Sequence, residues 1–105
     1  MTYIDQIPPN IKTALDLHAE CGRRCGSFVT AVLENDFATA IGCADDDSMA
    51  ALKQIAIYVH CNLPSPCHGS ESLVAIWRRS FDDPATAERN AALARSVREG
   101  ASFER

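Results

Sequence analysis

The stretch that decides the fold is residues 49–66, MAALKQIAIYVHCNLPSP. Apolar side chains recur in it at intervals of three and four residues, which is the spacing of one face of an α-helix. Proline cannot continue a helix, and it disfavours helical geometry in the residue before it. Pro64 and Pro66 therefore predict where this helix ends. The positions expected on its core side are Met49, Leu52, Ile55, Ala56, Val59 and Leu63.

Shorter helices are predicted on the N-terminal side of this stretch. Pro8–Pro9 suits the first turn of a helix, and Gly22 can end that helix in a left-handed conformation. Ser27 is the expected N-cap of a second helix. Asn35–Asp36 leaves two alternatives open: either Asp36 caps a third, short helix over 37–43, or one longer helix carries both polar residues on its solvent face. The second helix should bury Phe28, Val29, Val32 and Leu33.

The segments that flank these helices are predicted to be less regular. Residues 1–7 are expected as an extended arm whose apolar side chains lie on the core. Residues 44–48 are expected as a polar connection that supplies negative charge to a helix start. After the two prolines, Ser70 should cap the helix that contains Trp77.

The last predicted helix, 84–105, begins at Asp83–Pro84, where a cap residue precedes a proline of the first turn. It is rich in alanine and should bury little area, so we expect it at the periphery or in contact with another subunit. Strand signals are nearly absent from the sequence. The predicted fold class is therefore all-α, with one domain, 1–105, made of five or six short helices.

The composition restricts the classes of function. The chain has 105 residues and a net charge of −4, which argues against binding duplex nucleic acid through a broad basic surface. Arg23–Arg24 and Arg78–Arg79 are the only adjacent basic pairs in the sequence. No apolar run approaches the length of a membrane span, and the start of the chain has no secretory signal. We therefore expect a cytoplasmic protein whose five cysteines are free thiols.

Three stretches together resemble a family of short, uncharacterised bacteriophage and prophage proteins. They are IPPNIKTALD (7–16), GSFVTAVLENDF (26–37) and IYVHCNLPSPCHGSESLVAIW (57–77). The family has no established chemistry, so the resemblance implies no catalytic residue. In its pattern Cys67 belongs to the turn before the tryptophan, whereas Cys21, Cys25, His60 and Cys61 look like local variations.

A zinc site is one alternative for the turn. His60–Cys61 and Cys67–His68 stand in mirror order around it and are residue types that bind zinc. Neighbouring helical residues diverge by about 100°, so adjacent pairs cannot easily direct both side chains at one ion. The spacing matches no standard zinc pattern, and we expect no bound metal or cofactor. A second alternative is a cysteine-dependent protein, in which Cys67 is the nucleophile and His60 or His68 its base.

An anion site is the third interpretation of the turn. Gly69 and Ser70 precede a predicted helix, and the backbone N–H groups of a helix start can bind a phosphate. Arg78 is expected to reach the same region, either within the chain or from a neighbouring subunit. Tyr58 and Trp77 are candidates to stack on a nucleotide base. The competing structural roles are an ordinary helix cap, solvent-facing arginines and a core position for Trp77.

These observations together predict a non-enzymatic, phage-type binding protein without catalytic residues. Its partner would be a host protein or a small nucleotide-like signal, so that the protein acts in anti-defence from the host cytoplasm. A homo-oligomer is one of the forms that the sequence leaves open. If the turn does not bind the partner, the alternative location is the first link between helices, at Arg23, Arg24 or Asn35. The residues expected to bind a ligand or partner are Ser65, Cys67, His68, Gly69, Ser70 and Arg78.

Overall fold

The computed structural model describes the backbone of residues 3–104 and the side chains of residues 4–99. Within this part of the chain all regular structure is helical, and the radius of gyration is 13.0 Å, close to the value of about 13 Å for one domain of 100 residues. The predicted all-α domain is therefore confirmed. The elements in chain order, where η marks a 3-10 helix, are η1 (Tyr3–Gln6), α1 (Pro9–Cys21), α2 (Ser27–Leu33), α3 (Phe37–Cys43), α4 (Asp46–Ala50), α5 (Leu52–Asn62), η2 (Ser65–Cys67), α6 (Glu71–Ser80) and α7 (Pro84–Glu104).

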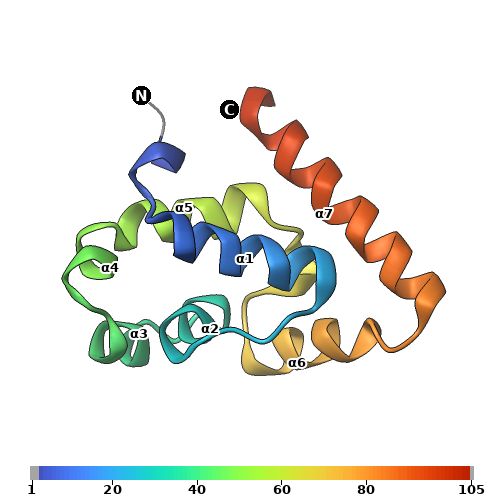
Figure 1. Ribbon diagram of the computed structural model, residues 1–105, viewed down its shortest axis with the longest axis horizontal. Coiled ribbons are helices and arrows are strands. Elements are labelled where there is room, and N and C mark those ends of the chain that lie inside the picture. Colours follow the sequence, from blue (N-terminus) through green and yellow to red (C-terminus); the bar gives the residue numbers. More distant parts are fainter. Residues whose placement is uncertain (1–2, 105) are drawn as a thin grey trace.

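The helices are arranged around α1 and α5 (Figure 1). The C-terminal helix α7 packs against both of them, and α2 packs against α3. Asp16 on α1 accepts a hydrogen bond from the Tyr58 hydroxyl of α5 (2.5 Å) and lies 3.7 Å from the guanidinium of Arg98 on α7. This one carboxylate therefore connects three helices. None of the helices in residues 3–104 is both long and apolar enough to cross a membrane.

One hydrophobic core lies between these helices, and α6 closes it at the end of α1. The indole Nε1 of Trp77 donates to the backbone carbonyls of His18 and Ala19, at 3.2 Å each. A buried indole N–H needs such a partner, so this contact fixes how α6 meets α1. Large core side chains are Ile7, Ile11, Leu15, Phe28, Val29, Val32, Leu33, Ile55, Tyr58, Val59, Leu63, Val74 and Trp77.

Most helix ends lie where local sequence signals place them. Gly22 follows α1 with φ 66°, the left-handed conformation expected of a glycine there. The Asp36 side chain accepts a hydrogen bond from the N–H of Thr39 and so caps α3. Asn35 has φ 62°, which lies in the left-handed region and is not helical. The chain therefore breaks between α2 and α3, which decides between the two alternatives. Asp83 caps α7 in the same way, by accepting from the N–H of Thr86.

Two expectations about helix starts are wrong. Residues 1–7 were expected to be extended, but Tyr3–Gln6 form a turn of 3-10 helix that ends with the N–H of Ile7 bonded to the carbonyl of Ile4 (3.1 Å). The turn is compatible with burying Ile7, as expected. Ser27 is the first residue of α2 rather than its cap, because Gly26 occupies the cap position and no side chain caps this helix.

The largest correction concerns residues 44–63, which form two helices instead of a loop and one helix. Asp45 accepts a hydrogen bond from the N–H of Ser48 (2.8 Å) and so starts α4 within the expected polar connection. The chain then turns at Ala51 before α5 begins. Met49 lies before this break and is 45% exposed, so its predicted core position is wrong, whereas Ile55 is fully buried.

The C-terminal helix α7 packs on its own chain, against α1 and α5. Ala94 is buried, whereas the neighbouring Leu93 is 42% exposed. The carbonyl of Arg98 accepts a hydrogen bond from the Asn62 side chain of α5, and its guanidinium also pairs with Glu20 of α1. Small side chains such as that of Ala94 thus allow α7 to pack closely on α1 and α5. The hydrogen bond and ion pair of Arg98 add polar contacts to the same two helices.

Candidate functional site

The turn between α5 and α6 is fixed to the body of the protein. Cys67 is fully buried, and its carbonyl lies 2.9 Å from Nε2 of the buried His18. The N–H of Gly69 donates to the carbonyl of Leu33 at the end of α2 (2.7 Å). One N–H group expected to be available to an anion is therefore already bonded. Cys67 belongs to the core, which corrects its predicted place on a binding surface.

The six predicted binding residues do not form one site. Ser65 and Gly69 are exposed, while Ser70 is partly buried and accepts a hydrogen bond from the N–H of Leu73 (3.1 Å). Arg78 lies eight residues further along α6, which is about 12 Å along a helix axis. The turn and Arg78 therefore belong to opposite ends of α6.

Ser70→Ala should lower the free energy of unfolding by about 1 kcal/mol, because it removes the side-chain acceptor that caps α6. Ser65→Ala is the matched control in the same turn: its side chain is exposed, so we expect a change within ~0.5 kcal/mol. Urea denaturation followed by circular dichroism measures both. Equal losses for the two variants would show that the cap does not stabilise the turn.

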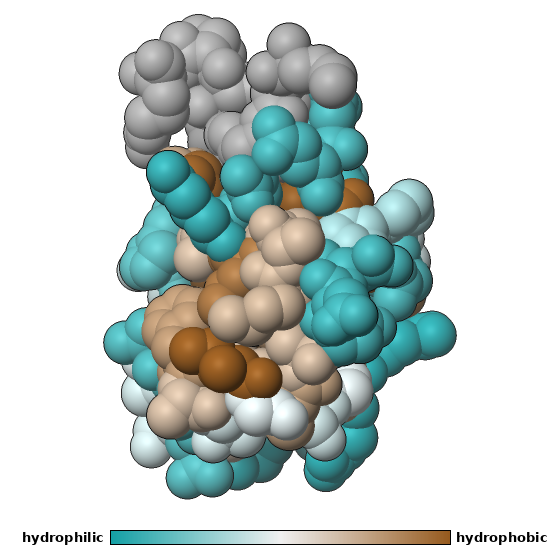
Figure 2. All heavy atoms as spheres, turned by 90° about the vertical axis from the view of Figure 1, so that its left-hand side faces the viewer, coloured by the Kyte–Doolittle hydropathy of each residue, from teal (hydrophilic) through white to brown (hydrophobic). Residues whose placement is uncertain are grey.

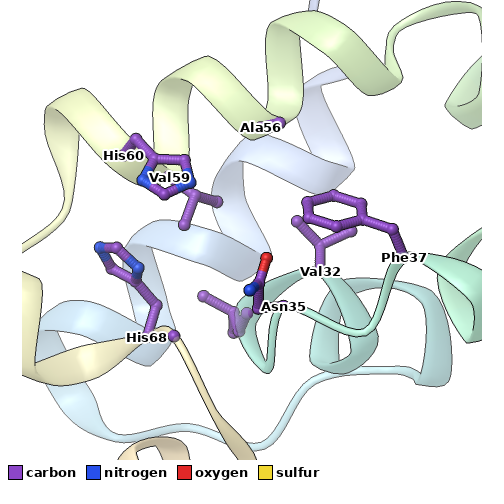
Figure 3. A pocket seen from close by; sticks show the side chains of 9 residues that line it. Val32, Asn35, Phe37, Ala56, Val59, His60 and His68 are labelled. Carbon is purple, nitrogen blue, oxygen red and sulfur yellow. The ribbon is translucent and has the colours of Figure 1, made fainter.

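A small pocket opens beside the turn, and we call it the turn pocket (Figure 3). Its volume is about 60 Å³, and its walls come from α2, α3 and α5. His60 and His68 lie at one end with ring centroids 5.6 Å apart and ring planes at 82°. Burial and, to a lesser extent, His60 lower the pKa of His68. The residues that line the pocket are Val32, Leu33, Asn35, Phe37, Ala56, Val59, His60, His68 and Gly69.

The structure does not assemble the four candidate zinc ligands. Burial raises the pKa of Cys67 to about 12, so its thiol stays protonated at neutral pH and is neither a good metal ligand nor a ready nucleophile. Among the described residues, no group of three or more His, Cys, Asp or Glu side chains is placed to hold a metal ion. Of the mirror-ordered set, the pair that faces each other is His60 and His68 (Figure 3).

A second, larger pocket lies at the other end of α6, against the link between α1 and α2. We call it the arginine pocket, because Arg24 of the link and Arg78 and Arg79 of α6 all line it. It is open to solvent and has a volume of about 430 Å³. Three arginines and one aspartate, Asp82, line it, so the pocket carries an excess of positive charge. The full lining is Cys21, Gly22, Arg24, Arg78, Arg79, Phe81 and Asp82.

Arg78 is the unusual member of this pocket. Its Nε and Nη2 atoms are shielded from solvent and have no hydrogen-bond partner among the described residues. Its charge also reaches the interior: burial lowers the pKa of His18, and the nearby Arg78 acts in the same direction. The ion pairs of the described side chains gather on Asp16 and Glu20, and none involves an arginine of the pocket.

The sequence contained a partial signal for this pocket. Its only two adjacent basic pairs, Arg23–Arg24 and Arg78–Arg79, each contribute to the pocket's surroundings, and the first link between helices was the alternative location for the site. The contact of Trp77 with the end of α1 brings the two pairs together. That contact was not predictable from spacing, and neither was the place of Gly22 and Phe81 in the lining.

A third surface is apolar and lies over α3 and α4 (Figure 2). Ile41 is 50% exposed and Met49 is 45% exposed. Within α3 it is Ala40, next to Ile41, that is fully buried. Exposed apolar groups that lie together are more common at contact surfaces than elsewhere on soluble domains.

Comparisons with known proteins found no match: no family model matches the chain, and no curated protein or solved structure is detectably similar to it. The resemblance to phage proteins therefore stays a prediction. The choice between the turn and the arginine pocket rests on the geometry and chemistry of the residues themselves.

Proposed function

We propose that this chain is a non-enzymatic binding protein that captures a small phosphate-bearing ligand in the arginine pocket. The observation that supports this is Arg78, whose shielded Nε and Nη2 atoms have no partner among the described residues. Shielding N–H donors from water without giving them a partner costs stability. Such a cost is typical of positions kept for binding.

The chemistry of the pocket suits a phosphate group. A guanidinium presents a planar set of donors that can bind two phosphate oxygens at once. Arg24 and Arg79 line the same pocket and add positive charge around Arg78. The volume of about 430 Å³ is larger than one phosphate group needs and falls within the ~300–1,000 Å³ of small-molecule sites. The ligand we propose is therefore nucleotide-like, with its phosphate on the arginines.

In this proposal the protein acts in the cytoplasm by holding the ligand, without converting it. If the resemblance to phage proteins is correct, the ligand would be a nucleotide signal of the host's antiviral defence, and its capture would interrupt that signal. A host protein is the second candidate partner, and the exposed Ile41 and Met49 on the α3–α4 surface favour it.

Arg78→Met tests the proposal by calorimetric titration with AMP, ADP and pyrophosphate. Methionine keeps an unbranched stem but removes the charge, so we expect at least tenfold weaker binding, which is about 1.4 kcal/mol. We expect the melting temperature to stay level or to rise, because two shielded N–H donors without a partner are removed. This combination distinguishes a ligand site from a structural arginine, whose loss would lower the melting temperature.

Arg95→Ala is the matched control, since it removes one positive charge from an exposed position on α7 outside the pocket. It should change affinity by less than about twofold at physiological salt, where distant surface charges are screened. Equal losses of affinity for Arg78→Met and Arg95→Ala would mean that only the net charge of the protein matters, and would overturn the proposal. So would the absence of binding of all three probes to the unmodified chain.

A further inference from the structure

The two histidines at the turn pocket are placed as a pair. His60 belongs to the last turn of α5, and His68 follows η2, so the sharp chain reversal brings the two rings together. Their centroids are 5.6 Å apart, and Figure 3 shows the rings turned toward each other across one end of the pocket. Nε2 of His68 is shielded from solvent and has no hydrogen-bond partner among the described residues. A strong acceptor or donor is thus left unused beside a second imidazole.

We propose that His60 and His68 form a two-imidazole site for a late first-row divalent metal ion, of which Zn²⁺ is the reference case. Two imidazoles that share a tetrahedral ion with metal–nitrogen bonds of ~2.1 Å have ring centroids about 5–6 Å apart, and the observed separation lies in that range. Imidazole nitrogen is a preferred ligand of Zn²⁺, Cu²⁺ and Ni²⁺. The site lies at the end of α6 opposite the arginine pocket and does not depend on it.

Such a site differs in kind from a structural zinc centre. Cys67 is in the core and its thiol is protonated, and Cys61 follows His60 on a helix, where neighbouring side chains diverge by about 100°. With two protein ligands, the remaining coordination positions are open to water or to a ligand from another molecule. The ion is therefore bound weakly and exchanges. The hydrophobic core holds the fold without it.

The chain has three histidines, which makes a direct test possible. In ¹H–¹³C correlation spectra of the imidazole Cε1–H groups, titration with Zn²⁺ should shift the His60 and His68 signals together, with one midpoint and one equivalent. His18 is the internal control, because it is fully buried and its Nε2 lies 2.9 Å from the carbonyl of Cys67. Its signal should stay in place. Signals of His60 and His68 that move with different midpoints, or that do not move, overturn the proposal.

Three variants complete the experiment. His60→Ala should weaken Zn²⁺ binding at His68 at least tenfold, and His68→Ala should do the same at His60, because removal of even an outer-shell partner costs ~10–100-fold. Cys61→Ser should leave both signals responding as before. If Cys61→Ser abolishes the response instead, a thiolate holds the ion and the two-imidazole site is wrong. A chelator should leave the helical circular dichroism unchanged, and loss of helix on chelation would contradict the weak, exchangeable site.

Discussion

Ile55→Ala is expected to lower the free energy of unfolding by about 2–5 kcal/mol, the range for a large aliphatic side chain removed from a core that cannot collapse. Ile55 is fully buried in α5 and is part of the core that α1, α2 and α6 share. The marginal stability of a small domain makes this a large fraction of the total. Urea denaturation followed at 222 nm measures it, and the variant should unfold at a clearly lower midpoint with an unchanged slope.

Leu52→Ala is the informative comparison, because it lies one turn earlier on the same helix. Leu52 only packs against the edge of the core and is partly exposed. The loss should therefore be smaller than for Ile55→Ala, at about 1–2 kcal/mol, in line with a partly buried side chain. If Leu52→Ala destabilised the protein as much as Ile55→Ala, the break at Ala51 would be misplaced and α4 and α5 would share one apolar face.

The same break explains how far the sequence predicted the fold. A spacing of three and four residues gives the correct side of a helix only while that helix is continuous. It therefore succeeded for Ile55 and Val59, which are buried, and failed for Met49, which precedes the turn at Ala51. The pattern contains no signal for that turn, since alanine is a good helix former.

Helix ends were more predictable than helix faces, because they depend on neighbouring residues alone. The signals at Gly22, Asp36, Ser70 and Asp83 all gave the observed ends. The apolar residues of α6 show the opposite case. Trp77 is buried, but Ile76 beside it is 56% exposed, since only one side of this helix meets the core. The sequence shows how many apolar side chains a helix carries, whereas tertiary packing decides which of them are buried.

The candidate site was less predictable still. The turn was expected to present its polar groups, but His18 and Leu33, far apart in the sequence, bond to its backbone. Arg78 was expected to reach the region of Ser70, but it lies near the other end of α6, which brings it to Arg24 instead. Long-range contacts of this kind leave no periodic trace in a single sequence. The adjacent arginine pairs contain the three arginines of the arginine pocket, but the sequence does not show that they meet.

Gly22→Ala is expected to be the most damaging change to the arginine pocket, with a loss of about 2–4 kcal/mol in the free energy of unfolding. Gly22 has φ 66°, and a side chain in this left-handed region costs ~1–2 kcal/mol. A Cβ there would also lie 2.5 Å from Cδ1 of Phe81, so the ring would have to move. Gly42→Ala is the control. Gly42 lies inside α3 with open space around it, and alanine should stabilise that helix by up to about 1 kcal/mol.

A double-mutant cycle with Phe81→Ala separates the two costs. Without the ring, Gly22→Ala should cost only the backbone strain of ~1–2 kcal/mol, and the difference between backgrounds measures the clash. An equal cost in both backgrounds would mean that Phe81 does not pack on Gly22. In the proposed function that packing matters for binding, because Gly22 and Phe81 line the pocket together with Arg24 and Arg78. A glycine at this position lets the end of α6 approach the link closely enough for arginines from both elements to face one ligand. Gly22→Ala should therefore weaken phosphate binding in the fraction of protein that remains folded, and normal affinity in that fraction would show that the arginines are positioned independently of this contact.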